Sequence, residues 1–377
     1  MSEHQRIAFR AIDGPVTEEN LEYMRRQSSR AEITSWSFDN EYHFGDFRGD
    51  AVEMLRRGYD LHLHYANFGI RKLLIRLPSG LPDAMAAKPY LGEDAFRFLP
   101  DKRGPGGILS IEPSHEPGDL EELWEFDNLL DRLVHLRAEI LAGDLRPLYL
   151  AHLAIACDGE HDPETTNEAP VPAGLEKLSD AQRALMELYD LREALIAAAA
   201  QGSPPLAALD DSRNQQKAWL QSQPEATKDA WLAQWMTDPH SSLRREILAK
   251  FQESRNAPLW PTMRRDRTIA EMEATATTIQ HESNLKAAAK AARQRAKRIA
   301  EMAADPGRTL LETEKLVTQR STEAYRQIAT LLADLREALA GSKQASLVEQ
   351  QARKLKRENP TLHKLTSELR RAGFVLK

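Results

Sequence analysis

Two neighbouring segments in the first third of the chain, residues 59–66 and 70–77, are the clearest predicted strands. Residues 61–65 alternate strictly between apolar and polar positions, which is the period-two pattern of a half-buried strand. The three residues 67–69 between the two segments contain a glycine and have the length of a hairpin connection. A two-stranded hairpin is therefore predicted here. Its first strand presents different residues on its two faces, Leu61, Leu63 and Tyr65 on one and Asp60, His62 and His64 on the other.

The rest of the N-terminal third mixes shorter strands and helices. Further strands are predicted at residues 5–12, 31–38, 95–99 and 107–111. Two helices are predicted between them, at 17–28 and 50–57, with Thr17 and Asp50 as N-caps and Gly58 as the stop of the second.

From residue 118 onward the apolar spacing becomes helical. The predicted helices span 119–142, 147–157, 179–200, 213–221, 227–236, 241–252, 268–303, 310–339, 346–359 and 361–371. Residues 158–174 hold acids, threonines and prolines without periodic apolar positions, which favours a flexible linker. The segment 268–303 contains no proline or glycine and is the strongest prediction of a long helix.

These elements predict an α+β protein. A small mixed-sheet domain at the N-terminus is followed by a mostly α-helical middle and a C-terminal helical hairpin or bundle. The segments expected are an α+β domain at 1–117, a helical pair at 118–157, the linker at 158–174, an acidic tryptophan-containing helical domain at 175–262 and a basic long-helix region at 263–377.

Composition narrows the class of protein. The 377 residues are 41% hydrophobic and 29% charged, which fits a helix-rich protein with solvated faces. The single cysteine, Cys157, lies in an apolar run and is interpreted as a buried structural thiol. The first residues lack the apolar core of a signal peptide, and the longest apolar stretch, 194–200, is too short to span a membrane. We therefore expect a cytoplasmic location, no membrane association and no cofactor.

Charge is distributed unevenly along the chain. Residues 241–377 hold 27 basic and 16 acidic side chains, although the whole chain has a net charge of −6. In the long helix, basic residues spaced i, i+4, i+7 and i+11 form one stripe, with two arginines beside it. The predicted partner- or phosphate-binding residues are Lys286, Lys290, Arg293, Arg295, Lys297 and Arg298, with a second cluster at Arg353, Lys354, Lys356 and Arg357. Such residues bind nucleic acid or an acidic protein, or dock onto acidic surfaces of the same chain.

Two histidines offer the best candidate for metal or ligand chemistry. His62 and His64 are two apart on a predicted strand and therefore share a face, which suits a metal ion. Tyr42 and His43, in an aromatic-rich loop, are candidate additional ligands. The alternatives are a polar outer face of an edge hairpin, or histidines that are hydrogen-bonded beneath a helix. The aromatic loop itself either forms a ligand pocket or covers the sheet with its own rings.

The motifs of the common enzyme classes are missing from the sequence. The glycine-rich run 104–107 lacks the order of a phosphate-binding loop, and its proline removes a backbone donor. The sequence contains no G-x-S-x-G motif, no dinucleotide fingerprint, no kinase motif set and no H-E-x-x-H. Trp231 and Trp235 are one helical turn apart, which favours core packing of a small helical domain over a partner groove.

Several segments resemble a family of uncharacterised bacterial proteins often encoded beside SWIM zinc-finger proteins. The segments that carry the resemblance are 145–150, 170–179, the Arg/Ala-rich helix near 285–298, and the ending 359–365 with 371–373. The resemblance covers residues 119–377 and implies a bacterial intracellular origin and a nucleic-acid-linked operon. It assigns no site residue, and the N-terminal α/β unit departs from it.

The segregated charge and the missing catalytic motifs favour a non-enzymatic interaction or adaptor protein. In this hypothesis the basic helix docks an acidic protein partner or nucleic acid. The alternatives are a metal- or small-ligand-binding N-terminal domain, which would allow catalysis, and sequence-independent nucleic-acid binding by the C-terminal helices. The sequence leaves the oligomeric state open.

Overall fold

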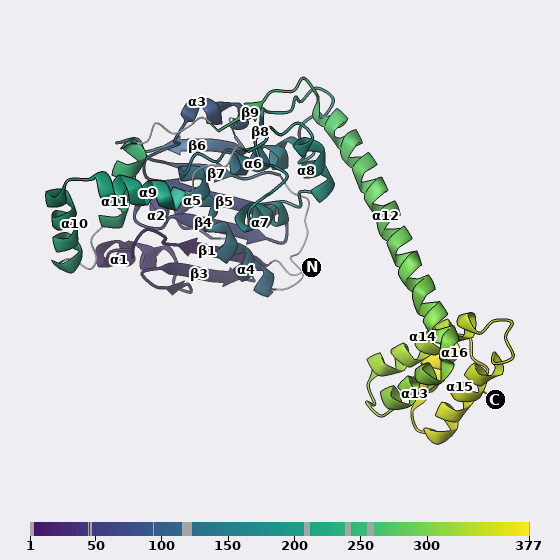
Figure 1. The fold of residues 1–377 in the computed structure, drawn as a ribbon. Helices are drawn as coiled ribbons and strands as arrows, with labels where there is room; N and C mark the ends of the chain where they lie inside the picture. Colours follow the sequence, from purple (N-terminus) through teal and green to yellow (C-terminus); the bar gives the residue numbers. More distant parts are fainter. Residues whose placement is uncertain are drawn as a thin grey trace. The chain divides into compact units, whose positions relative to one another are not determined.

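The chain forms two compact units, residues 1–280 and 281–377, and helix α12 (Ile269–Ala304) belongs to both (Figure 1). The computed structural model of the protein describes residues 4–43, 45, 47–92, 94–114, 123–206, 212–237, 243–254 and 260–376. None of the helices described there combines the length and the apolar content that a membrane span requires. The predicted segments that end before residue 263 all lie in the first unit.

A seven-stranded antiparallel sheet is the centre of the first unit. Its strands are β1 (Gln5–Arg10), β2 (Glu32–Ile33), β3 (Ser37–Tyr42), β4 (Leu61–Ala66), β5 (Ile70–Leu77), β6 (Phe96–Pro100) and β7 (Gly107–Ile111). They are ordered β2-β3-β1-β4-β5-β7-β6, and the predicted hairpin is the pair β4–β5. The N-terminal antiparallel sheet followed by mostly helical segments confirms the α+β prediction.

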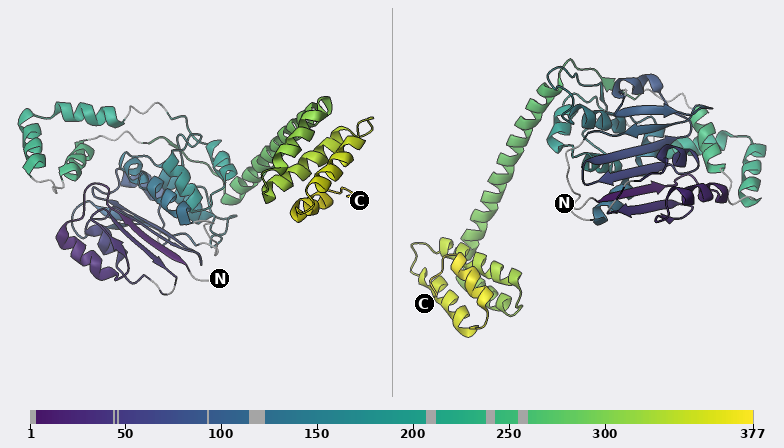
Figure 2. Two further views of the ribbon diagram at one scale, coloured as in Figure 1. Left: turned by 90° about the horizontal axis from the view of Figure 1, so that it is seen from below. Right: turned by 180° about the vertical axis from the view of Figure 1, so that it is seen from behind.

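Helices cover both faces of this sheet, as the two sides of the sheet in Figure 2 show. Helices α1 (Glu18–Gln27) and α2 (Ala51–Arg56) pack on one face, against Phe9, Phe38 and Leu74. The opposite face packs against later helices through Leu61, Leu63, Tyr65, Leu73 and Ile75. The helices that contribute residues to the core on this face are α3 (Ala84–Ala87), η1 (Lys88–Tyr90), α4 (Leu123–Leu133), α5 (Leu136–Leu141), α6 (Arg146–Ala156), α7 (Asp180–Leu188) and α8 (Glu193–Ala200).

The alternative of a polar outer face on the hairpin that holds His62 and His64 is therefore wrong for His62. His62 lies on the face covered by α1 and α2, where it is fully buried. Alternation correctly separates the two faces of β4, but a covered face tolerates a histidine when its ring is stacked and hydrogen-bonded.

Two predicted long helices are each divided in the structure. Residues 123–141 form α4 and α5, with a break near His135; residues 119–122 of the prediction lie outside the described residues. Residues 180–200 form α7 and α8, and between them Asp190 has a positive φ of 51°. The apolar period continues through both breaks, so periodicity alone gave one helix where there are two.

The segment predicted as a flexible linker is packed over its second half. Strand β8 (Val171–Pro172) pairs with β9 (Thr262–Met263) in a small second sheet, and Val171 is fully buried. Glu168 is also buried, and its carboxylate binds Arg267. Local composition misled the prediction because the partners of this segment lie about a hundred residues later in the chain.

Between α8 and β9, the described residues form three helices, namely α9 (Ser212–Ser222), α10 (Glu225–Thr237) and α11 (Leu243–Ser254). Trp219 stacks on Trp231 with ring centroids 6.0 Å apart and contacts Phe251 edge-on at 5.4 Å. Trp231 is buried, but Trp235 is 68% exposed, so the prediction that both tryptophans pack in a core is wrong for Trp235.

The second unit is a helical bundle. Beyond the end of α12 it contains α13 (Pro306–Val317), α14 (Thr322–Ala338), α15 (Ser346–Glu358) and α16 (His363–Arg371). Its core is mostly aliphatic, with Ile328, Leu332, Leu335, Val348, Leu355, Leu365 and Leu369 all buried. The predicted helix 310–339 is two helices here, divided near Arg320, which has a positive φ of 49°.

Candidate functional site

The middle of helix α12 is exposed on all sides. Every residue from 281 to 298 is exposed, over about five turns of helix. The alanine-rich composition explains how this stretch stays helical without burial, because alanine, lysine, arginine and glutamine are strong helix formers. The basic residues predicted from the sequence lie on this exposed rod.

Two of these arginines fasten α12 to its own bundle. The Arg295 Nη2 and Nη1 donate to the two oxygens of the Glu337 carboxylate, at 2.5 and 3.2 Å, and these hydrogen bonds raise the Arg295 pKa. Arg298 lies 3.2 Å from Asp334, also on α14. For Arg295 and Arg298, the alternative that basic residues of α12 dock onto acidic surfaces of the same chain is therefore the one found.

The four residues of the stripe point elsewhere. At about 100° per residue, Lys286, Lys290, Arg293 and Lys297 cluster in a direction roughly 140° away from Arg295 and Arg298. Lys286 and Lys297 are 82% and 80% exposed, and their nearest carboxylates are 3.9 and 3.8 Å away. Lys290 and Arg293 have no ion-pair partner among the described residues. Exposed ion pairs of this length contribute little to stability, so the stripe residues can exchange them for contacts with a partner.

An apolar seam runs beside the basic stripe. It consists of Leu285, Ala289, Ala292 and Ala296, whose spacing of four, three and four residues is that of the contact positions of a coiled coil. All four are exposed, and Leu285 has 57% of its surface accessible. The seam lies about 100° from the stripe, and both lie away from the face that contacts α14.

The second basic cluster is largely engaged within the bundle. Lys354 donates to Glu314 at 2.5 Å, which lowers the pKa of Glu314 and raises that of Lys354. Lys356 donates to the Leu376 carbonyl at 2.6 Å, and Arg353 to the Val375 carbonyl at 3.4 Å. These contacts hold the chain's last described residues against α15. Arg357 lines a groove of about 440 Å³ with Arg353 and Lys354.

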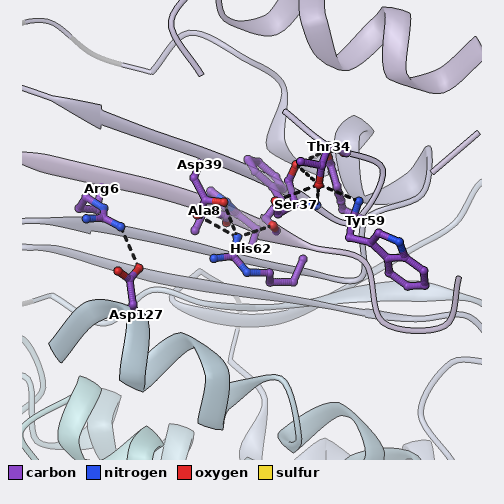
Figure 3. Close-up of polar contacts among 11 residues, drawn as sticks. Arg6, Ala8, Thr34, Ser37, Asp39, Tyr59, His62 and Asp127 are labelled. Carbon is purple, nitrogen blue, oxygen red and sulfur yellow. Dashed lines mark hydrogen bonds and ion pairs between the residues drawn. The ribbon is translucent and has the colours of Figure 1, made fainter. Parts of the chain in front are cut away.

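In the first unit, His62 is a packed core residue. Its ring stacks on Phe9, with centroids 4.1 Å apart, and its Nδ1 lies 3.1 Å from the Ala8 carbonyl oxygen (Figure 3). Burial, with a smaller contribution from His64, lowers the His62 pKa to about 3. The ring is buried and is neutral at physiological pH, which matches the alternative of a hydrogen-bonded histidine beneath a helix.

The other predicted ligands do not gather around His62. His64 contacts the Gln5 side chain at 3.0 Å, and its ring centroid is 6.4 Å from that of His62. Tyr42 packs on the core beneath α1 and α2, as does Phe47, which covers Phe9 and Phe38. The aromatic loop thus covers the sheet with its own ring at Phe47; Phe44 lies outside the described residues.

His43 instead joins two residues that the sequence reasoning missed. Its Nε2 lies 3.3 Å from the Glu41 Oε1, and the His4 Nε2 lies 2.9 Å from the same oxygen. The three ligand-capable atoms lie within 4.8 Å of one another. The β1–β3 register explains why these residues meet: Gln5 lies opposite Tyr42, so the residue before Gln5 lies beside the residue after Tyr42.

Charged residues continue this row along the same face of β1 and β3. Arg6 donates to Asp127 of α4 at 2.9 Å, as Figure 3 shows, and lies 3.9 Å from the Glu41 Oε2. Arg10 donates to both oxygens of Asp39 at 2.9 Å. Burial raises the pKa of Asp39, although Arg10 opposes that effect.

Comparison with protein-family models, with curated proteins and with solved structures finds no match at the level of significance applied. The resemblance to bacterial proteins encoded beside SWIM zinc-finger proteins therefore stays a prediction.

Proposed function

We propose that this protein is a non-enzymatic docking protein that binds an acidic helix of a protein partner along α12. The observation that carries the proposal is the exposed basic stripe of Lys286, Lys290, Arg293 and Lys297 beside an exposed apolar seam. Coiled-coil partners combine an apolar contact line with complementary charges at its flanks. A helix with acids at matching intervals would satisfy both features at once.

A protein partner is favoured over nucleic acid by the chemistry of this surface. The exposed stretch 281–298 contains no phenylalanine, tyrosine or tryptophan on which bases could stack. Its small alanines allow another helix backbone to approach closely. Phosphate binding by the same lysines is the competing function, and the experiment below separates the two.

The expected strength follows from exposed ion pairs. Each contributes about 0.2–1 kcal/mol, so four of them provide about 1–4 kcal/mol, or roughly 5-fold to several hundred-fold in affinity. Reversal of the four charges replaces attraction by repulsion and is expected to weaken binding by at least that factor. Because the residues are exposed and unpacked, reversal should leave the fold intact.

The test is affinity capture with the full chain from nuclease-treated extract of the native cells, with the bound protein identified by mass spectrometry. The K286E/K290E/R293E/K297E variant should lose the partner. A control with the same charge change at exposed positions, K315E/K343E/K364E/R370E, should keep it. Reversal of acids on the helix of the identified partner should restore binding to the stripe-reversed variant.

Other outcomes would overturn the proposal. Capture that survives stripe reversal would show that α12 is not the docking surface. Capture that disappears after nuclease treatment, together with binding of purified duplex DNA or RNA whose affinity falls steeply with salt, would establish nucleic-acid binding instead.

A further inference from the structure

Two strands of the sheet bring three metal-ligating side chains to one point. In the antiparallel pair β1–β3, Gln5 lies opposite Tyr42 and Arg6 opposite Glu41. Alternation places His4 and Arg6 on one face of β1, and Glu41 and His43 on the same face of β3. The side chains of His4, Glu41 and His43 therefore meet at the ends of the two strands.

The distances fit the edges of a metal coordination polyhedron. Ligand atoms about 2.1 Å from a tetrahedral zinc ion lie roughly 3.4 Å from one another. The Glu41 Oε1 lies 2.9 Å from the His4 Nε2 and 3.3 Å from the His43 Nε2. All three atoms lie within 4.8 Å, so small side-chain rotations suffice to surround an ion.

The backbone holds two of the ligands in place. Glu41 is part of strand β3, and His4 is tied to the β4–β5 turn by two hydrogen bonds. The His4 amide donates to the Asn67 side chain at 3.0 Å, and the Asn67 amide donates to the His4 carbonyl at 3.0 Å. His43 is the outer ligand, with 64% of its side chain exposed.

The charged neighbours orient the carboxylate. Arg6 lies 3.9 Å from the Glu41 Oε2 and so faces the oxygen that the histidines do not contact. Arg6 also donates to Asp127 at 2.9 Å, so its positive charge is shared between two acids. Such support for a ligating carboxylate is common around metal ions and orients its free oxygen.

We infer that His4, Glu41 and His43 form a binding site for a divalent transition metal, of which zinc is the representative. Two imidazoles and one carboxylate suit zinc and its neighbours in the first transition series, and do not suit calcium or magnesium, which prefer oxygen ligands. Three protein ligands leave a fourth position for water or another molecule, and the exposure of His43 opens that position to solvent.

The site differs from the one expected from the sequence. It uses His43 but neither His62, whose Nδ1 is engaged by the Ala8 carbonyl in the core, nor His64, which contacts Gln5. It also lies in the first unit and is independent of the docking surface on α12.

The test is zinc uptake by the metal-free full chain without an affinity tag, measured by competition with a chromogenic chelator. We expect one zinc ion per chain and a loss of affinity of at least about 100-fold in His4→Ala and in His43→Ala, because loss of a ligand costs more than loss of its support. Cobalt substituted for zinc should show the visible absorption of a tetrahedral nitrogen and oxygen site in the unaltered chain and lose it in both variants.

A matched control distinguishes this site from adventitious histidine binding. His161→Ala removes a half-exposed histidine of the same unit, 3.3 Å from Asp158, and should bind zinc like the unaltered chain. His43 is exposed, so His43→Ala tests the ligand without disturbing the core. No stoichiometric uptake, or unchanged affinity in both ligand variants, would overturn the inference.

Discussion

Neutralisation of Glu168 should destabilise the first unit by several kcal/mol. Glu168 is buried, and its carboxylate accepts hydrogen bonds from the Arg267 Nε and Nη2 at 2.7 and 2.9 Å, and from the Tyr149 hydroxyl at 2.7 Å. Glu168→Gln keeps the shape but leaves the largely buried Arg267 without its counter-charge. Breaking a buried pair in this way costs about 3–5 kcal/mol.

The effect should be concentrated where the segment before β8 joins the start of α12. The Glu168 amide donates to the Arg267 carbonyl, and the Ile269 amide at the start of α12 donates to the Thr166 carbonyl. Loss of the ion pair should therefore open these backbone hydrogen bonds before it affects the seven-stranded sheet. Hydrogen exchange of the Val171 amide and of the first turn of α12 is expected to accelerate in Glu168→Gln.

The assay is urea unfolding of the full chain followed by circular dichroism, with hydrogen exchange to locate the change. The exposed Glu164→Gln in the same segment is the control and should change stability by less than about 0.5 kcal/mol. Replacement of both partners, Glu168→Gln with Arg267→Met, should recover much of the loss, because no charge is left buried and unpaired. A cost below about 1 kcal/mol for Glu168→Gln, or a double variant as unstable as the sum of the singles, would refute the reasoning.

Two further predictions follow from shifted pKa values in the first unit. Burial lowers the His62 pKa to about 3, against about 6.5 in the unfolded chain, so the unfolded state binds the proton first and stability is lost as pH falls below 6.5. Between pH 6.5 and 5 the loss in the free energy of unfolding is about 1.6 kcal/mol. His62→Phe, which keeps the stacked ring, should remove that part of the pH dependence measured by urea unfolding; an identical pH dependence in both proteins would contradict this. Burial, helped by the nearby Glu273, raises the Cys157 pKa to about 12. Native protein at pH 8 should therefore react with a disulfide reagent on the order of 1,000-fold more slowly than unfolded protein, because only the thiolate reacts. Equal rates in the native and unfolded protein would show an accessible thiolate and contradict this prediction.

Local pattern was sufficient to predict much of the fold. The β4–β5 hairpin follows from the strict alternation of residues 61–65 and the short glycine-containing turn after them, and α12 follows from a long run of strong helix formers. The helix breaks near His135 and Asp190 escaped prediction because apolar spacing continues through them. At Asp190 the side chain contacts the buried Arg71 of β5, a partner that no local window contains.

The candidate sites show the same limit. The predicted strand at 31–38 ended four residues before β3 ends at Tyr42, which placed Glu41 and His43 in a loop. Without the β1–β3 register, His4 had no reason to be considered with them. His62 and His64 were correctly given one face of β4, but the sequence could not show that helices cover that face and bury His62.

The sequence predicts ten basic residues of the C-terminal region as partner- or phosphate-binding, and the structure shows that several of them already hold contacts within the bundle. Arg295 and Arg298 bind carboxylates of α14, and Lys354 and Lys356 bind Glu314 and the Leu376 carbonyl. A side chain already held by a carboxylate or a carbonyl would have to break that contact before it could bind a partner, so these residues contribute little to docking. The four residues of the α12 stripe differ from these, because their side chains are exposed and make no ion pair with α13–α16 among the described residues. Net charge counts all of these residues equally, whereas docking favours exposed basic residues that share one helix face and are not held by the bundle. The stripe meets both conditions, so the four-residue stripe, and not the whole C-terminal region, is the surface to reverse.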